Sequence, residues 1–211
     1  SPEGTDKKTV AAEVYNDILK KYRQAIAEEW DMGKLEENRL SYLCAYSYGV
    51  YAGDTDPLEE IGYYYRDIDG DGIDELFIGK NSDGDWIETI YQVYSFKEGA
   101  STVVIDAGER NRYYLTQDDT FYNEGSGSAV NSVLFHYRMQ GPYKFLYFID
   151  GIVYEGDFEN ADKHPYFYTD RETWLTEYMK AISEEEFENY RKKAEESYVD
   201  IEYIPLNSTE S

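Results

Sequence analysis

The spacing of apolar residues changes near residue 61, from steps of four to alternation, and this change limits the chain to folds that combine helices with a sheet. Before that point, apolar residues recur every fourth position, at Val14, Ile18, Tyr22, Ile26 and Trp30. Such steps are typical of one side of an amphipathic helix. After it, short segments alternate apolar and polar residues between turn-forming dipeptides, which is typical of half-buried strands. The spacing therefore predicts an α+β protein.

Two helices are expected in an N-terminal helical part that covers residues 9–53. The first begins at Thr9, which is a suitable cap, and the polar residues 1–8 before it are expected to form a flexible tether. Residues 31–33 break the pattern. A second helix is then expected to carry an apolar face made of Leu40, Leu43, Cys44 and Ser47. We expect the two to pack as a helical hairpin whose apolar stripes belong to the core.

A β-rich part is expected over residues 61–168. Candidate strands cover residues 62–66, 75–79, 86–96, 102–106, 112–115, 120–122, 130–139, 144–149 and 152–158. The connections are short and contain turn-forming sequences, namely Asp83-Gly84, Glu98-Gly99, Gly125-Ser126-Gly127, Gly141-Pro142 and Asp150-Gly151. Short connections favour an antiparallel meander over parallel crossovers, so we expect one such sheet of about eight strands.

A helix and a closing strand are expected in the last part, over residues 170–206. Ser183 and Glu186 have the spacing of a capping box, in which each side chain bonds the other's free backbone N–H. The C-terminal helix that they open is expected to pack on the sheet, and alternation over residues 199–206 predicts the strand. Residues 9–206 are thus expected to form a single α+β domain, followed by a polar tail at residues 207–211.

Charge and cysteine content exclude several classes of protein. The chain has 44 acidic and 20 basic residues and a net charge of −24, a field that repels phosphate backbones, so nucleic-acid binding is not expected. A nucleic-acid mimic would need an acidic stripe. No apolar run reaches the roughly 18 residues of a membrane-spanning helix. The single cysteine, Cys44, rules out an intrachain disulfide and is expected to be buried and inert.

An acidic loop in residues 61–79 carries the sharpest chemical signal. Carboxylates alternate along it, Gly72 allows a tight turn, and a further acid follows three residues later. Calcium takes six to eight oxygen ligands from flexible loops of this kind. The predicted calcium ligands are the side chains of Asp67, Asp69, Asp71 and Glu75 and the backbone carbonyl of Ile73.

Two other acidic motifs fit this loop less well. An EF-hand requires a bidentate glutamate at position twelve, followed by a helix, whereas here Ile78 holds position twelve and a strand is expected. A phosphatase of the haloacid dehalogenase type also opens with Asp-x-Asp-Gly after a strand, but Asp71 stands where that motif has threonine or valine.

The loop resembles the FG-GAP or VCBS type, whose pattern is D-x-[DN]-x-D-G-x-x-[DE]-L before an apolar strand, and residues 67–76 match each fixed position. More broadly, the chain is similar to a group of uncharacterised secreted or lipid-anchored bacterial proteins. They share a helical N-terminal part, one loop of this type, strands like residues 90–96 and a helix opening like residues 182–186. The resemblance implies an exported, non-catalytic domain with a lipid anchor upstream of Ser1, and it carries over no activity.

Residues outside the acidic loop leave two other functions open, glycan hydrolysis by a carboxylate pair and binding by a tyrosine-rich face. Neither His136 nor His164 has metal-ligand spacing, and Ser126 and Ser128 belong to turn-like Gly-Ser-Gly-Ser sequence. A glycan hydrolase needs two carboxylates about 5–10 Å apart, and sequence alone does not pair them. The 24 tyrosines could form a binding face for a glycan or a protein, or they could pack the sheet and core.

We therefore expect an exported, non-enzymatic binding or accessory domain, extracellular or on the cell surface, with one structural calcium loop. Its partner would be a glycan or a protein at the cell surface. The start at Ser1, without an initiator methionine, agrees with a processed N-terminus. The alternatives are an extracellular hydrolase that acts on glycans through a carboxylate pair, and an intracellular acidic inhibitor or immunity protein.

Overall fold

The chain forms helices and two antiparallel sheets in a computed structural model, which confirms the α+β class. The structure describes residues 2–50, 52–81, 90–128, 130–140, 145–157, 159–160 and 163–208. It divides into two compact units, one of residues 1–108 with 201–211 and the other of residues 109–200. The expected single meander is divided between two sheets, and the single domain expected over residues 9–206 stays a prediction.

The first helix, α1, spans Pro2–Ala27, so it begins before Thr9 and corrects the prediction of a tether for residues 2–8. Proline is suited to a first helical turn, because its missing N–H would have no partner there. The buried side of α1 is centred on Tyr15, Leu19 and Tyr22, with Val14 and Ile18 half-buried at its edge. Each step of four residues advances about 40° beyond a full turn, so the predicted stripe starts at the edge of the buried side and reaches the core at Tyr22 and Ile26.

The second helix is shorter than expected and is broken. It consists of α2 (Met32–Glu37) and the 3-10 helix η1 (Tyr42–Ser47), which correct the single helix of the predicted hairpin. Arg39 lies between them with a φ of 59°, in the left-handed region, and the N–H of Leu40 turns back to the carbonyl of Leu35. The expected apolar face is nevertheless confirmed, since its four residues are all buried. Burial also raises the pKa of the Cys44 thiol, which keeps it protonated.

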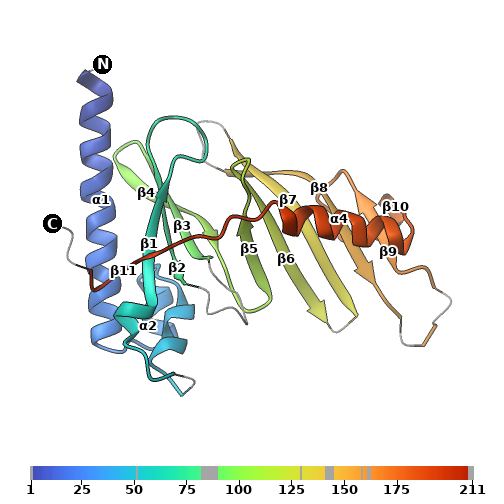
Figure 1. Cartoon of the computed structure of the whole chain (residues 1–211), viewed down its shortest axis with the longest axis horizontal. Coiled ribbons are helices and arrows are strands. Elements are labelled where there is room, and N and C mark those ends of the chain that lie inside the picture. Colours follow the sequence, from blue (N-terminus) through green and yellow to red (C-terminus); the bar gives the residue numbers. More distant parts are fainter. Residues whose placement is uncertain are drawn as a thin grey trace. The chain divides into compact units, whose positions relative to one another are not determined.

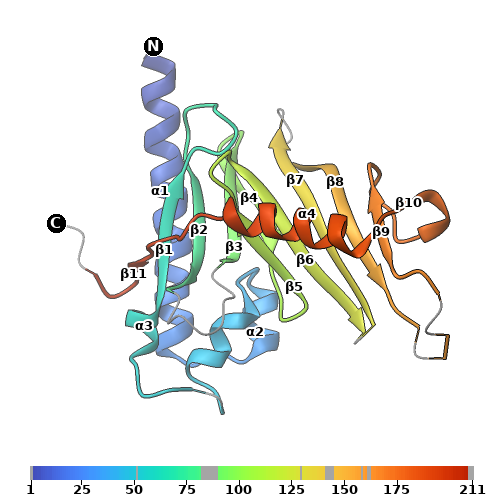
Figure 2. The same cartoon turned by 45° about the vertical axis from the view of Figure 1, so that its right-hand side comes forward.

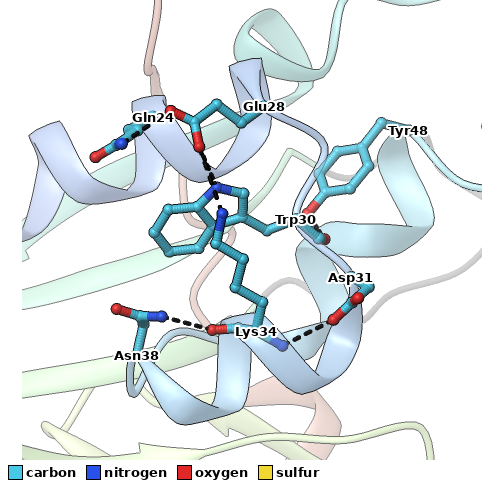
Figure 3. A network of polar contacts seen from close by, with 7 residues as sticks. All are labelled: Gln24, Glu28, Trp30, Asp31, Lys34, Asn38 and Tyr48. Atoms are coloured by element: carbon cyan, nitrogen blue, oxygen red, sulfur yellow. Dashed lines mark hydrogen bonds and ion pairs between the residues drawn. The ribbon is translucent and has the colours of Figure 1, made fainter.

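A polar network holds the corner between α1 and α2 (Figure 3). The Trp30 indole donates a 2.7 Å hydrogen bond to Oε2 of Glu28, and this bond holds the pKa of Glu28 below its ordinary value. Lys34 places its Nζ 4.0 Å from the centroid of the Trp30 ring, a cation–π contact. The Tyr48 hydroxyl donates to the Trp30 carbonyl at 2.8 Å. One tryptophan thus joins the end of α1 to both short helices.

The first unit contains a five-stranded sheet in the order β11-β1-β2-β3-β4 (Figure 1). After the short helix α3 (Pro57–Glu60), its strands are β1 (Ile61–Arg66), β2 (Glu75–Lys80), β3 (Ile90–Lys97), β4 (Ala100–Asp106) and β11 (Ile204–Pro205). The closing strand predicted over residues 199–206 is thus limited to two residues, which pair with β1. The helix α1 packs against this sheet, where the Tyr22 hydroxyl donates to Oε1 of Gln92 at 2.5 Å.

The turn between β3 and β4 confirms one hairpin prediction. Glu98 and Gly99 have φ angles of 51° and 86°, as a type I′ turn requires at both central residues. The predicted turns at Asp83-Gly84 and Gly141-Pro142 lie outside the described residues.

The second unit contains a six-stranded meander in the order β10-β9-β8-β7-β6-β5. Its strands are β5 (Asn111–Leu115), β6 (Thr120–Ser128), β7 (Asn131–Gln140), β8 (Phe145–Glu155), β9 (Tyr166–Thr169) and β10 (Lys180–Ala181), and the 3-10 helix η2 (Thr176–Tyr178) precedes β10. The helix α4 (Glu184–Glu196) crosses one face of this sheet (Figures 1 and 2). Phe187 and Ala194 pack there against Leu134 and Ile152, which confirms the predicted packing. The capping box at Ser183 is also formed.

Two other predicted turns are wrong, because their glycines allow close packing within strands. Residues 125–127 lie inside β6, and residues 150–151 lie inside β8, so the two strands expected at 144–149 and 152–158 are one. A Cβ at Gly151 would lie 2.5 Å from the Phe135 ring and 2.8 Å from the carbonyl oxygen of Leu134. The position therefore needs glycine where β7 and β8 approach. A register shift, with Tyr137 opposite Phe148, accommodates the extra residue Ile149.

Candidate metal centre

The acidic loop leads directly from β1 to β2 (Figure 1). Arg66 and Glu75 face each other as the last pair of the antiparallel ladder, and residues 67–74 form the connection. The strand–loop–strand arrangement expected from the sequence is confirmed, since a strand and no helix follows the loop. Because β1 and β2 are adjacent, anything that orders this loop acts on the hairpin that they form.

Three aspartates of the loop converge. Asp67, Asp69 and Asp71 each offer a carboxylate oxygen, and these oxygens lie within 4.8 Å of one another. Asp67 and Asp69 are half-buried, and Asp71 is exposed. Like charges this close repel one another, which a cation between them would relieve.

Backbone N–H groups hold the aspartates in place. Both oxygens of Asp67 accept 2.8 Å hydrogen bonds, Oδ1 from the N–H of Gly70 and Oδ2 from that of Gly72. Oδ1 of Asp71 accepts a 2.8 Å hydrogen bond from the N–H of Ile73. Gly70 and Gly72 have φ angles of 73° and 84°, which side chains rarely allow, so the glycines let the backbone wrap around the carboxylates. The loop is therefore ordered by its own sequence.

Glu75 is turned toward the interior and has no exposed surface. Its Oε2 accepts a 2.9 Å hydrogen bond from the N–H of Ile68, and its Oε1 accepts one of 2.8 Å from the Ser95 hydroxyl. The buried charge is thus paired with donors from the loop and from β3, as a buried carboxylate requires. Coordination of calcium by Glu75 and by the Ile73 carbonyl stays a prediction.

Tyr15 of α1 lies near the same site. Burial raises the pKa of its hydroxyl, and the negative charges of Glu75 and Asp71 raise it further. A cavity of about 280 Å³ between α1 and the loop is lined by Tyr15, Tyr65 and Ile73. The helix therefore approaches the inner side of the acidic loop.

The donor set fits a hard cation. It consists of carboxylate oxygens without histidine or cysteine, which suits calcium and is unlike the nitrogen and sulfur sets of zinc sites.

The chain matches no protein-family model, no curated protein and no solved structure. The chemistry of the loop is therefore inferred from its own geometry.

His136 belongs to a second polar cluster, beneath α4. Its Nε2 lies 2.7 Å from the Thr120 hydroxyl, and its Nδ1 lies 3.4 Å from Oδ1 of Asp150. The order aspartate, histidine, hydroxyl is that of a hydrolase triad. However, Thr120 is only 2% exposed, and its hydroxyl is also 2.7 Å from that of Thr116. A hydroxyl in this position cannot reach a substrate, so we interpret the cluster as structural.

The other residues singled out in the sequence lie elsewhere. Ring nitrogen Nε2 of His164 lies 2.8 Å from the carbonyl oxygen of Tyr166 in the exposed approach to β9. Ser126 lies inside β6. None of the described helices is both long enough and apolar enough to cross a membrane.

Sequence reasoning missed Ser95 and Ile68 as the partners of Glu75. Ser95 reaches Glu75 because Tyr94 pairs with Leu76 in the β2–β3 ladder. The register of these two strands has no local signal in the sequence. Ile68 could have been found, because a backbone N–H inside a tight acidic loop needs an acceptor.

Proposed function

We propose that the protein is an exported, non-enzymatic binding or accessory domain in which the acidic loop binds one structural calcium ion. Asp67, Asp69 and Asp71 would hold the ion, with Glu75 and the Ile73 carbonyl completing the site. The observation that carries the proposal is the convergence of three aspartate oxygens within 4.8 Å. The partner would be a glycan or a protein at the cell surface.

The role of calcium in this proposal is to stabilise the β1–β2 hairpin. Neutralising the aspartates removes their mutual repulsion, which favours the closed conformation of the loop. With a dissociation constant of about 0.1 mM, calcium at about 1–2 mM stabilises a fold by roughly 1.5 kcal/mol. Submicromolar calcium contributes almost nothing at the same affinity. A site of this strength would act only outside the cell, in line with the proposed location.

Thermal unfolding in 2 mM calcium and in excess chelator tests the proposal. The parent is expected to melt about 3–6 °C higher with calcium. Asp69→Asn keeps an oxygen that can accept from the N–H of Asp71 but removes one charge, so most of the shift should disappear. Asp74→Asn is the matched control, because Asp74 is an exposed acid of the same loop outside the convergent group.

Two results would overturn the calcium proposal. One is a parent melting temperature that does not change between calcium and chelator. The other is an Asp69→Asn variant with the same calcium shift as the parent and as Asp74→Asn.

One observation favours the hydrolase as a second candidate. Glu36 and Asp106 both line a cavity of about 690 Å³ in the first unit, away from the acidic loop. Oδ1 of Asp106 accepts a 2.8 Å hydrogen bond from the Gln92 amide, which holds this carboxylate in place. This candidate predicts release of reducing sugar ends from glycans, abolished by either Glu36→Gln or Asp106→Asn. An absence of release by the parent would exclude it for the glycans assayed.

A further inference from the structure

The cavity of about 690 Å³ has the size of a small-molecule site. Four elements of the first unit form its walls: α1, the segment from α2 to η1, β3 and β4. Its lining differs from the chain as a whole, in which acids outnumber bases by 44 to 20. Two cations, Lys21 and Arg39, balance two carboxylates there, Glu36 and Asp106.

The floor of the cavity is rigid and polar. Gln92 and Tyr94 line it and are only 2% and 4% exposed. Oε1 of Gln92 accepts from the Tyr22 hydroxyl, and its Nε2 donates to Oδ1 of Asp106. Each polar atom of the amide is engaged, so its orientation is fixed. Such a floor is preorganised and loses little entropy when a ligand binds.

Arg39 is held at the cavity by the same floor. The Tyr94 hydroxyl donates a 3.0 Å hydrogen bond to the Arg39 carbonyl, while the backbone of Arg39 stays in the left-handed region. Residues other than glycine adopt this conformation at a cost, and such strain gathers at ligand sites. The Tyr94 hydroxyl thus helps to fix the backbone of Arg39, whose side chain lines the cavity.

We propose that this cavity binds a uronic acid, either a free sugar acid or a residue of an acidic glycan. The guanidinium of Arg39, assisted by Lys21, would bind the carboxylate of the sugar, since its planar fork matches that group. Glu36 and Asp106 would accept hydrogen bonds from sugar hydroxyls, and Ser101 and Thr102 add further polar groups on β4. The proposal rests on the proposed binding role and names its ligand, and it does not depend on the calcium loop.

The positive and negative side chains that line the cavity favour one class of acidic ligand over others. A phosphate dianion would face Glu36 and Asp106 and be repelled by both. A sugar monoanion has one carboxylate for the cations and several hydroxyl donors for the acids. A neutral sugar has hydroxyl groups for the acids but no carboxylate for Arg39 and Lys21.

The test is a titration followed by backbone amide chemical shifts, with glucuronate and galacturonate as probes and glucose and galactose as their neutral counterparts. We expect at least one uronate to bind with a dissociation constant of a few millimolar or tighter, at least tenfold more tightly than its neutral counterpart. The shifted amides should include those of Arg39, Ser101 and Thr102.

Matched variants distinguish the loss of a ligand contact in the cavity from the effect of a similar substitution elsewhere in the chain. Arg39→Gly removes the guanidinium and relieves the strained φ, so it should fold and bind the uronate at least tenfold more weakly. Glu29→Gly relieves a similar φ of 49° at an exposed site outside the cavity and should bind within about twofold of the parent. Lys21→Gln should weaken binding, whereas Lys20→Gln, at the preceding residue of α1, should not.

Three outcomes would overturn the proposal: uronates that bind no more tightly than neutral sugars, an Arg39→Gly variant that binds like the parent, or shifts confined to other surfaces. Repeating the titration with chelator and with Asp69→Asn separates it from the calcium proposal. A parent melting temperature that does not respond to calcium, with uronate binding unchanged, would refute the calcium proposal and leave the cavity proposal standing.

Discussion

Oε2 of Glu75 accepts a 2.9 Å hydrogen bond from the backbone N–H of Ile68, so the last acid of the loop holds its first turn from within the protein. The acidic loop therefore has two layers. The inner layer is Glu75, which is fully buried and paired with protein donors. The outer layer is the group of three aspartates, whose charges face one another. Substitutions in the two layers should have different consequences.

Glu75→Gln is expected to lower the free energy of unfolding by about 1–3 kcal/mol even in the absence of calcium. The neutral amide keeps one oxygen acceptor in place of two, so the charge-assisted bonds to the Ile68 N–H and the Ser95 hydroxyl are weakened, and the hydroxyl must turn to accept from the new N–H₂ group. Urea denaturation in chelator measures this loss. Asp74→Asn makes the same charge change on the exposed side of the loop and should stay within about 0.5 kcal/mol of the parent. Equal losses in both variants would contradict the inner role of Glu75.

Gly62→Ala is expected to destabilise the first unit by about 1–3 kcal/mol, because β11 pairs too closely with β1 to admit a side chain. A Cβ at residue 62 would lie 2.5 Å from the Ile204 carbonyl oxygen and 2.8 Å from Cβ of Tyr203. Gly53→Ala is the control, since a Cβ at Gly53 meets nothing within 4 Å. Denaturation curves of the two variants test this, and a Gly62→Ala variant as stable as the parent would show that β11 is dispensable.

Asp150 should make the second unit sensitive to acid. Partial burial acts to raise the pKa of Asp150, but hydrogen bonds from His136 and Tyr190 outweigh it and hold that pKa below its ordinary value. The Tyr190 hydroxyl donates to Oδ1 of Asp150 at 2.6 Å. A carboxyl group whose pKa is lower in the folded protein stabilises the fold at pH values above its unfolded pKa of about 3.9. This stabilisation is lost as the pH falls through the pKa of the folded state.

The stability difference between the parent and Asp150→Asn should therefore be larger at about pH 5 than at about pH 3. Guanidinium denaturation at these two values measures it. Asp170→Asn, which alters a side chain that is 77% exposed, serves as the control and should differ little from the parent at any pH. A difference for Asp150→Asn that grows on acidification would contradict the assignment.

Ser183→Ala should cost about 1 kcal/mol by leaving the N–H of Glu186 without its acceptor. Ser183→Asp keeps an acceptor at the cap and should restore most of the stability. The helical signal of α4 in thermal unfolding reports both variants. If alanine and aspartate behaved alike, the capping box would not stabilise α4.

Local signals in the sequence determined the fold class, the strand–loop–strand nature of the acidic site, the Glu98-Gly99 turn and the capping box of α4. Each depends on residues a few positions apart, whose hydrogen bonds and turn angles follow from the chain itself. The alternation of the three aspartates likewise placed their oxygens together before any packing was known.

Only the tertiary structure decided what depends on distant strands. It divided the strands between two sheets and placed Gly151 inside β8, because β7 approaches too closely for a side chain there. It turned Glu75 inward to Ser95 and joined Tyr94 to the strained Arg39, contacts that cross 20 and 55 residues of chain. Sequence spacing cannot encode such contacts, since they are fixed by strand register and by the packing of α1 and the segment from α2 to η1 on the sheet.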